Sequence, residues 1–367
     1  MNARLAPLRS VVAQPARVAL LGTGTVGSAV WARLAAWAEQ SSVGNPFGGR
    51  LSLVHVANSR FSISNRNGIP ADTRELLLRN APRDNSLDAV GDALGGSGMR
   101  IVIDATASAD VAEQHAKWLA SGIHVVTACK LGQGTSLARW HAIQSARARG
   151  GTQYGDAATV GAGLPLLRTL RELQAGGDRI HAIAGVLSGS LAWLFNHYDV
   201  LRPFSSFVRA ARDAGYTEPD PRDDLSGEDV RRKLLILSRA AGYILEADAV
   251  QVDSLVPPAL AALAQDDVDA ALPLLDAPLR ERYAAAYKNG EKLRFIARLQ
   301  AGGLATVGLE SLAADHPLAG GAGTDNRVAI WSDRYSEQPL VIQGPGAGAG
   351  VTAAALLDDA LRIAREA

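Results

Sequence analysis

Residues 18–34, VALLGTGTVGSAVWARL, hold the signal that decides the fold. An apolar run ends at Gly22, further glycines follow at Gly24 and Gly27, and an Ala-rich helical stretch begins directly afterwards. Between a strand and a helix, such glycines permit a tight turn, close approach of the backbone to a pyrophosphate, and close helix–strand packing. The helix N-terminus, with Thr25 and Val26, then faces the phosphates. The stretch predicts a dinucleotide-binding turn; the alternative is a tight turn without a ligand.

Apolar runs and helical stretches continue to alternate outward from this turn. Beside the strand at 17–21, the pattern predicts strands at 51–57, 100–104 and 124–127 and helices at 28–40, 73–78 and 109–120. Alternation of this kind is typical of parallel strands with helices on both faces. We therefore predict an α/β domain with a Rossmann-type, doubly wound parallel sheet over residues 1–150.

The pattern changes after Gly150, where we expect a second, α+β domain. A glycine-rich segment at 160–165 leads into a helix that ends near residue 174. The later strands are predicted at 180–187, at 293–309 as a pair turning at Gly302-Gly303, and at 327–332 and 340–343. Helices are predicted at 205–214, 227–242 and 352–366, and the segment 253–283 has helical spacing.

Composition narrows the class of protein. A chain of 367 residues is long enough for two domains, and Lys plus Arg equals Asp plus Glu at 37 each. A zero net charge argues against a nucleic-acid binder. The single cysteine, Cys129, excludes a disulfide framework and a multi-cysteine zinc site. No apolar run is long enough to span a bilayer. Residues 1–15 are interpreted as a mobile leader that lacks a signal-peptide cleavage site, and the protein is expected to be cytoplasmic.

The end of the second strand bears on the choice of cofactor. An acidic residue there binds the ribose 2′-hydroxyl of NAD, but no Asp or Glu occurs between Glu39 and Asp72. The strand ends instead in Ala-Asn-Ser-Arg60, and the planar guanidinium of arginine suits a 2′-phosphate. The sequence therefore favours NADP, with NAD as the alternative if Arg60 is an ordinary surface residue.

Two further strand ends carry polar residues. Thr106 follows the strand at 100–104, and Lys130 follows the strand at 124–127. Ligands of open α/β sheets bind at the carboxyl ends of the strands. We therefore expect Thr106 to contact the cofactor and Lys130 to lie near the nicotinamide. Cys129 is interpreted as structural, since the only nearby histidine is His124 in the preceding strand.

The densest chemical signal is GYTEPDPRDDLSGEDVRRK, residues 215–233. Pro219 and Pro221 predict an extended loop, and Ser226 is a candidate N-cap for the next helix. Asp229 and Lys233 are four residues apart and share a face of that helix, where a plain surface ion pair is the alternative. Further carboxylates gather just ahead of the helix: Glu218, Asp220, Asp223 and Asp224.

Like charges crowded together are costly unless a cation shares the site. The α-ammonium group of an amino-acid substrate would satisfy this cluster of carboxylates.

At this point the chain resembles the homoserine dehydrogenase family over nearly its whole length. The block GYTEPDPRDDLSG followed by a helix lysine is the most specific match. The other segments occur in the family's order and spacing: GTGTVG (22–27), HVVTACK (124–130), ATVGAGLP (158–165), GVLSGSLAWLFN (185–196) and GPGAGAGVTA (344–353).

This resemblance implies the reversible reduction of L-aspartate 4-semialdehyde to L-homoserine with NAD(P)H, a step toward threonine and methionine. Lys233 would be the general acid, Lys130 would position the substrate and the nicotinamide, and Glu218 would bind the substrate ammonium. The Gly215 backbone, Asp224 and Asp229 would shape the pocket.

The resemblance also has implications for architecture. Gly348 would contact the cofactor, so that residues 336–367 return to the nucleotide domain and residues 151–335 form the substrate and dimerisation domain. A homodimer is implied, with neither an aspartokinase nor an ACT domain.

A monovalent cation, Na⁺ or K⁺, is implied by the same resemblance. Backbone carbonyls would bind it, from Ala157, Val160, Ala162 and Leu164; the alternative is a plain glycine-rich helix entry. The chain departs from the family at four positions: Cys129 replaces the usual Asn, Ala157 an acidic residue, and Ser190 and Ala192 a Thr and an Asn.

Two other hypotheses remain open. One is a related oxidoreductase acting on a different amino-acid semialdehyde. The other is a catalytically inactive cofactor sensor, against which the retention of Lys130, Glu218, Asp229 and Lys233 argues.

Overall fold

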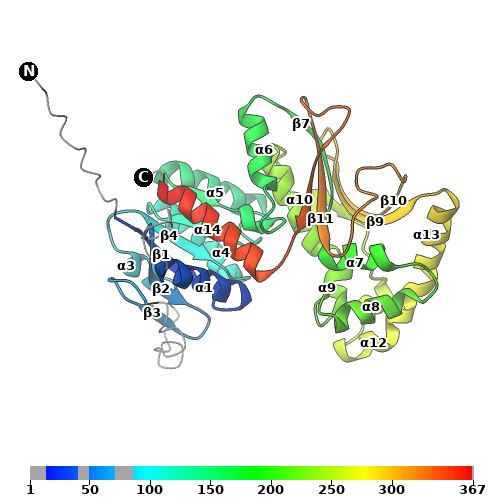
Figure 1. Cartoon of the computed structure of the whole chain (residues 1–367), viewed down its shortest axis with the longest axis horizontal. Coiled ribbons are helices and arrows are strands. Elements are labelled where there is room, and N and C mark those ends of the chain that lie inside the picture. Colours follow the sequence, from blue (N-terminus) through cyan, green and yellow to red (C-terminus); the bar gives the residue numbers. More distant parts are fainter. Residues whose placement is uncertain (1–13, 40–48, 71–85, 366–367) are drawn as a thin grey trace, which may run out of the picture.

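The computed structural model describes residues 14–39, 49–70 and 86–365. The predicted helix at 73–78 and most of the predicted leader lie outside these residues. The chain forms two α/β lobes that lie side by side (Figure 1). Among the described residues, no helix has the length and apolar character needed to cross a membrane.

The first domain is built on a six-stranded sheet of order β3-β2-β1-β4-β5-β6. Its strands are β1 (Ala16–Leu21), β2 (Leu51–Ala57), β3 (Ser62–Ser64), β4 (Arg100–Asp104), β5 (His124–Thr127) and β6 (Tyr154–Gly155). Its helices are α1 (Thr25–Glu39), α3 (Ala89–Leu94), α4 (Ala109–Ala120) and α5 (Leu137–Gly150). All neighbouring strands are parallel except β3, which turns back antiparallel along β2.

Alternating side chains of the first sheet form two cores. Val18, Leu20 and Ile103 pack with Trp31 of α1, whereas Leu21 and its neighbours pack with α3, α4 and α5 on the opposite face. This period of two is what parallel strands covered on both faces require.

The carboxyl ends of the strands are in register. Leu21 pairs with Ala57 on one side and with Asp104 on the other, and Asp104 pairs with Thr127. The loops that carry the predicted cofactor residues therefore leave the sheet along one edge.

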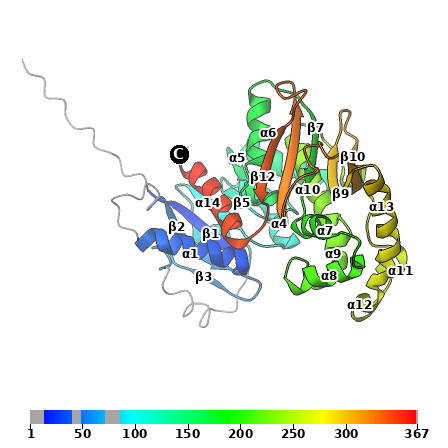
Figure 2. The same ribbon diagram turned by 45° about the vertical axis from the view of Figure 1, so that its right-hand side comes forward.

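The second domain contains a mixed sheet of order β12-β11-β7-β9-β10-β8. Its strands are β7 (Ile180–Val186), β8 (Val250–Val252), β9 (Lys292–Leu299), β10 (Ala305–Leu312), β11 (Asp325–Ser332) and β12 (Leu340–Pro345). Its α-helices are α6 (Leu166–Ala175), α7 (Gly189–His197), α8 (Phe204–Asp213), α9 (Pro221–Leu225), α10 (Glu228–Ala240), α11 (Pro258–Ala261), α12 (Val268–Ala271) and α13 (Asp276–Lys288). The upright strands are visible in Figure 2, with α6 and α10 beside them.

Two local predictions for the second domain are wrong. The extended loop around Pro219 and Pro221 is interrupted by α9, because proline is tolerated at the first helical position and Asp220 accepts a hydrogen bond from Arg222 N at 3.0 Å. The residue that precedes α10 is Gly227, with φ of +77°, and not Ser226. The Ser226 hydroxyl still accepts a hydrogen bond from Glu228 N at 3.3 Å.

The last helix, α14 (Ala349–Arg365), leaves the second sheet after β12 and packs beside α1 in the first domain (Figure 1). Ala353, Leu356 and Ile363 of α14 are fully buried in the core that contains Trp31. The fold class and the return of the chain through α14 are thereby confirmed. Within the predicted segment 336–367, β12 pairs with β11 in the second sheet, and the domain boundaries remain a prediction.

Candidate active site

The turn after β1 has the glycines that a dinucleotide-binding turn needs. Gly22 has a φ of +94°, and a Cβ there would lie 2.7 Å from Ala105 O. A Cβ at Gly27 would lie 1.9 Å from Gly22 O, so neither position accepts a side chain. A Cβ at Gly24, in contrast, meets nothing within 4 Å. Because the first turn of α1 carries no acidic residue, the open space before its N–H groups suits a phosphate.

Neighbouring strand ends meet at this turn. Thr25 and Val26 begin α1, and Asn58 at the end of β2 donates a hydrogen bond to the Thr23 hydroxyl at 2.8 Å. The Asn58 side chain also accepts a hydrogen bond from Arg60 N at 2.8 Å, which turns the chain and leaves Arg60 exposed. The Thr106 Cγ2 would lie 3.0 Å from a Cβ on Gly22. The predicted cofactor residues of the first domain thus share one edge.

A buried polar network centred on Asp104 lies at the carboxyl ends of β4 and β5. Asp104 is fully buried, and its carboxylate accepts hydrogen bonds from the Thr106 hydroxyl at 2.7 Å and the Thr127 hydroxyl at 3.0 Å. His115 lies 3.0 Å from the same carboxylate and 2.9 Å from the Tyr154 hydroxyl. Such a network fixes the loops after β4 and β5, because each member has a partner in a region of low dielectric.

Cys129 belongs to this support. Its backbone N–H donates to the Thr127 hydroxyl at 2.8 Å, and its side chain is 2% exposed. Burial, with a smaller effect of the Asp104 charge, raises the pKa of the thiol to about 11. The thiol is therefore protonated at neutral pH, which fits a structural role better than a nucleophilic one.

Lys130 and α10 form the charged centre of the candidate site. The Lys130 ammonium lies 3.1 Å from one Asp229 oxygen, and the Lys233 ammonium lies 2.8 Å from the other. Lys233 also donates to Leu187 O at 2.8 Å, and only 12% of its side chain is exposed. The i,i+4 pair predicted on α10 is thus part of a Lys–Asp–Lys arrangement that joins the two domains.

Electrostatics keep Asp229 ionised. Burial would raise the pKa of this carboxyl, but the charges and hydrogen bonds of Lys233 and Lys130 outweigh it and hold the pKa well below its usual value. Two ammonium groups share one carboxylate, so the centre carries a net positive charge, which favours an oxygen on which negative charge develops.

A second carboxylate lies on α9. Asp224 accepts a hydrogen bond from the Ser190 hydroxyl at 2.6 Å and from Glu218 N at 2.8 Å. Burial raises the pKa of Asp224, while these two donors lower it. The Glu218 side chain itself is exposed. The Thr217 hydroxyl beside it is buried and, within the described ranges, has no hydrogen-bond partner.

Sequence reasoning gave no role to three groups at this centre. Leu187 O accepts from Lys233 and, at 3.4 Å, from the buried Asn326 of β11. Ser190, in the first turn of α7, is the partner of Asp224. The segment GVLSGSLAWLFN was part of the family resemblance, but a carbonyl acceptor has no side-chain signature that a sequence pattern reveals.

Two other predicted residues, Gly215 and Gly348, adopt left-handed turns, and no hydrogen bond joins either of them to the two lysines among the described residues. Gly215 follows the C-cap of α8 with a φ of +73°, and its N–H donates to Arg212 O at 2.9 Å. Gly348 has a φ of +119° and precedes α14, whose Gly350 O accepts a hydrogen bond from Arg33 of α1 at 3.2 Å.

The segment of the predicted cation site lies between β6 and α6. Ala162 has an unusual positive φ of +49°, and Leu164 O accepts a hydrogen bond from Leu166 N at 2.8 Å. Ala157 begins a short 3₁₀ helix, η2 (Ala157–Thr159), and Val160 follows it.

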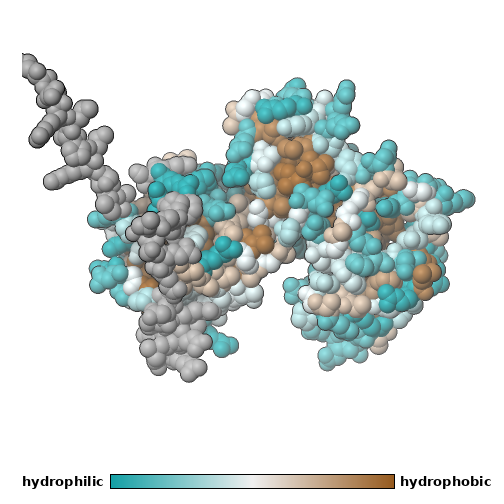
Figure 3. Space-filling model, in the orientation of Figure 1, coloured by the Kyte–Doolittle hydropathy of each residue, from teal (hydrophilic) through white to brown (hydrophobic). Residues whose placement is uncertain are grey.

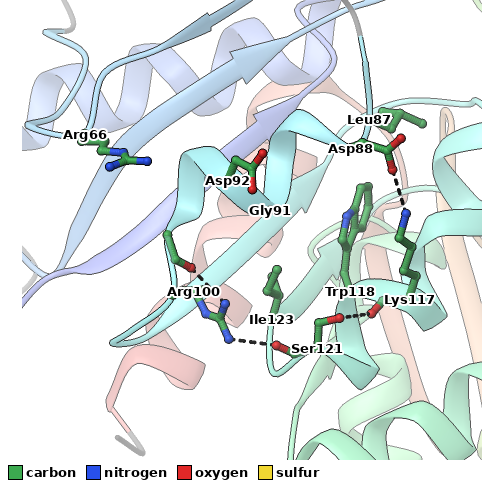
Figure 4. Close-up of a pocket in the computed structure, with 12 residues that line it drawn as sticks. Arg66, Leu87, Asp88, Gly91, Asp92, Arg100, Lys117, Trp118, Ser121 and Ile123 are labelled. Carbon is green, nitrogen blue, oxygen red and sulfur yellow. Dashed lines mark hydrogen bonds and ion pairs between the residues drawn. The ribbon is translucent and has the colours of Figure 1, made fainter.

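A separate pocket of about 540 Å³ opens at the amino ends of β4 and β5 (Figure 4). Three of its charged groups contact other protein groups: Lys117 pairs with Asp88 at 2.7 Å, and Arg100 donates to Ser121 O at 2.8 Å. It lies at the opposite end of the sheet from Lys130. Among the described residues, no group of three or more His, Cys, Asp or Glu side chains is placed to hold a metal ion.

Two family models and several known proteins match this chain. The family model described as homoserine dehydrogenase matches residues 165–361, and that of the homoserine dehydrogenase NAD-binding domain matches residues 22–154. The homoserine dehydrogenase of Schizosaccharomyces pombe is 35% identical, covering 94% of this chain and 94% of that protein. The bifunctional aspartokinase/homoserine dehydrogenase 2 of Escherichia coli is 40% identical over 94% of this chain. The chain spans 43% of the length of that bifunctional relative.

A solved structure resembles this chain over nearly its whole length. The crystal structure of a Candida auris protein of unknown function has a TM-score of 0.87 and 34% identity, covering 96% of this chain and 98% of that one. Together with the two family models, these relatives confirm the resemblance stated from the sequence. The chain belongs to the homoserine dehydrogenase family, whose members are NAD(P)-dependent oxidoreductases.

Proposed function

We propose that this protein reduces L-aspartate 4-semialdehyde to L-homoserine with NADPH, in a reversible reaction. The observation that carries the proposal is the Lys130–Asp229–Lys233 arrangement. It joins the carboxyl edge of a dinucleotide-binding sheet to the helix that follows the acidic loop. Family membership supports the same reaction.

In this reaction the protein would orient the substrate, stabilise the charge that develops on its oxygen, and donate one proton. A nicotinamide cofactor held at the glycine turn, Gly22 to Gly27, would supply a hydride to the aldehyde carbon, and the carbonyl oxygen would then gain negative charge. Lys233 donates a proton to that oxygen, and the resulting amine is reprotonated from solvent. Asp229 and Leu187 O orient the ammonium group, and Lys130 adds positive charge where the alkoxide develops.

The carboxylates at the other end of the site fit an amino-acid substrate. Glu218 is exposed, and its backbone N–H donates a hydrogen bond to the Asp224 carboxylate. Its own carboxylate is therefore available to a substrate ammonium. Asp224 and the Gly215 turn shape the wall beside it, and the unpartnered Thr217 hydroxyl lies in the same loop.

The direct test is turnover of wild-type protein. NADPH oxidation should proceed with L-aspartate 4-semialdehyde and be slower with the homologous aldehyde that is one methylene longer. Equal or faster turnover of the longer aldehyde would favour the alternative of a related oxidoreductase. Tight NADPH binding without turnover of either aldehyde would contradict catalysis and favour a cofactor sensor.

Arg60 is proposed to select NADP. Its backbone is fixed by Asn58 while its side chain is exposed beside the glycine turn, where it can reach a 2′-phosphate. Arg60→Ala is expected to raise the KM for NADPH about 10-fold or more, the scale of one charge-assisted contact, and to leave the KM for NADH unchanged. Arg66→Ala, another exposed arginine in the same domain, is the control. Equal effects of Arg60→Ala on both cofactors would contradict the assignment.

We further propose a monovalent cation at the carbonyls of Ala157, Val160, Ala162 and Leu164. The left-handed Ala162 supports it, because a non-glycine residue tolerates this conformation only when its surroundings hold it. Among the described residues, no backbone hydrogen bond reaches the carbonyls of Val160 or Ala162. Activity in potassium and sodium buffers, compared with tetramethylammonium buffer, tests this site.

A cytoplasmic homodimer acting in threonine and methionine biosynthesis is the remaining part of the proposal. Apolar residues gather on the face over the second sheet (Figure 3). There β12 is an edge strand, with Val341 37% exposed. Exposed apolar edges of this kind are usually covered in oligomers, and sedimentation of the purified protein tests the dimer.

A further inference from the structure

The segment that follows Lys130 lies directly on α10. A Cβ at Gly134 would lie 2.8 Å from Lys130 O and 3.1 Å from Arg232 O. The Gly134 N–H also donates to Lys130 O at 2.7 Å, closing a turn. The backbone of the first domain therefore touches the backbone of α10 at a point where no side chain fits.

Arg239 holds this contact from the far end of the same helix. Its guanidinium donates to Gln133 O at 2.6 Å and to Thr135 O at 2.9 Å, on either side of Gly134. It also donates to Leu245 O at 2.8 Å, which fixes its own position. Arg239 is 5% exposed, and burial lowers its pKa to about 10, so it remains charged at neutral pH.

This geometry connects Arg239 to the charged centre. Asp229 lies ten residues earlier on α10, about 15 Å along a rigid helix. Lys130 begins the segment that Arg239 binds. The Arg239 guanidinium therefore fixes the distance between Lys130 in the first domain and Asp229 in the second, which form an ion pair. The planar fork of arginine can engage two carbonyls at once, which an ammonium group does less well.

We propose that Arg239 is a positioning residue, which fixes segment 130–136 on α10 and so holds the Lys130 ammonium at Asp229. The inference rests on the proposed function, because its consequence is the placement of Lys130 beside the reacting carbonyl.

The test is a double-mutant cycle with Arg239→Met and Lys130→Met, measured as kcat for aldehyde reduction. Arg239→Met alone is expected to lower kcat about 10- to 100-fold, the scale of a misplacement near 1 Å. In the Lys130→Met background it should have no further effect, because the group it positions is gone. Multiplicative losses in the cycle would overturn the proposal.

Arg294→Met is the matched control for stability. Arg294 is also buried, at 7% exposure, and donates to three carbonyls, including Phe195 O at 2.8 Å and Ala319 O at 2.7 Å. Among the described residues, its guanidinium donates no hydrogen bond to segment 130–136. Both variants should melt at lower temperature, but only Arg239→Met should lose kcat through Lys130. Equal kcat losses would overturn the proposal.

A second readout does not depend on activity. The rate of Lys130 acetylation by acetic anhydride, followed by mass spectrometry, should rise several-fold in Arg239→Met and not in Arg294→Met. Lys117 at the opposite end of the sheet is the internal reference, with 63% of its side chain exposed. An unchanged Lys130 rate overturns the positioning role. Absent turnover in the wild type, with a raised Lys130 rate, instead contradicts only the proposed reaction.

Discussion

Replacing Lys233 by methionine is expected to lower kcat for L-aspartate 4-semialdehyde about 1,000-fold, within the range that general acids contribute. Methionine has a similar length but no proton to donate, and it occupies the partly buried position of the lysine between Asp229 and Leu187 O. Asp229 keeps Lys130 as its partner at 3.1 Å, so the site should not collapse. Steady-state NADPH oxidation measures kcat, and NADPH fluorescence measures the dissociation constant, which should not change.

Lys117→Met is the control for this experiment. Lys117 is an exposed lysine in the first domain that pairs with Asp88, away from the charged centre, and its loss should leave kcat intact. Should Lys233→Met weaken NADPH binding as much as it lowers kcat, the lysine would have a structural role. Retention of a large part of wild-type kcat would assign the proton to another donor.

The first domain could be predicted closely because its signals are local. The strands at 51–57, 100–104 and 124–127 have the predicted bounds, since buried parallel strands are short apolar runs between polar ends. The glycine turn was also predicted correctly, because its glycines and the flanking strand and helix are adjacent in the sequence. In contrast, α5 was not predicted, because LARWHAIQSARARG alternates apolar and charged residues without a strong stripe.

The second domain depends more on tertiary context. The segment 253–283 has helical composition, yet it forms α11, α12 and part of α13 separated by short 3₁₀ turns. Pro257 and Pro258 stand at the start of α11, and Pro273 lies in the 3₁₀ turn between α12 and α13, where it removes a backbone donor. The short α9 likewise depends on the Asp220 cap, which a rule for proline alone does not include.

In the candidate site, too, contacts within one helix could be predicted from the sequence, whereas contacts between distant segments could not. The spacing of Asp229 and Lys233 predicted their ion pair, because a helix brings i and i+4 together. No local rule brings Lys130 to Asp229 across 99 residues, and the family resemblance was needed to connect them. Arg239 was missed because its partners are backbone carbonyls, and Leu187 O because it is a backbone carbonyl itself, a group that every residue has.

Asp156→Asn is expected to have the largest effect on stability. Asp156 is 1% exposed and makes two hydrogen bonds to the Arg171 guanidinium of α6, at 2.7 and 2.5 Å. Its carboxylate also accepts a hydrogen bond from Gln133 at 2.7 Å, and so ties the segment after Lys130 to both domains. The Arg171 side chain is 45% exposed, so solvent screens the pair, and the substitution should cost less than the about 3 kcal/mol typical of a fully buried pair. Urea unfolding of both proteins measures the difference.

The pH dependence of that difference gives the sharper test. Burial alone would raise the pKa of Asp156, but Arg171 and Gln133 outweigh it, so the folded-state pKa lies below its usual value. The stabilisation by the carboxylate is therefore fully present above the unfolded pKa, about 3.9, and is lost as pH falls toward the folded pKa. The gap between wild type and Asp156→Asn should be constant down to about pH 5 and should narrow below about pH 4. Asp88→Asn, which breaks the exposed pair with Lys117, should show no measurable gap at any pH. A gap for Asp156→Asn that persists unchanged below about pH 4 would mean that its charge is not what joins the two domains.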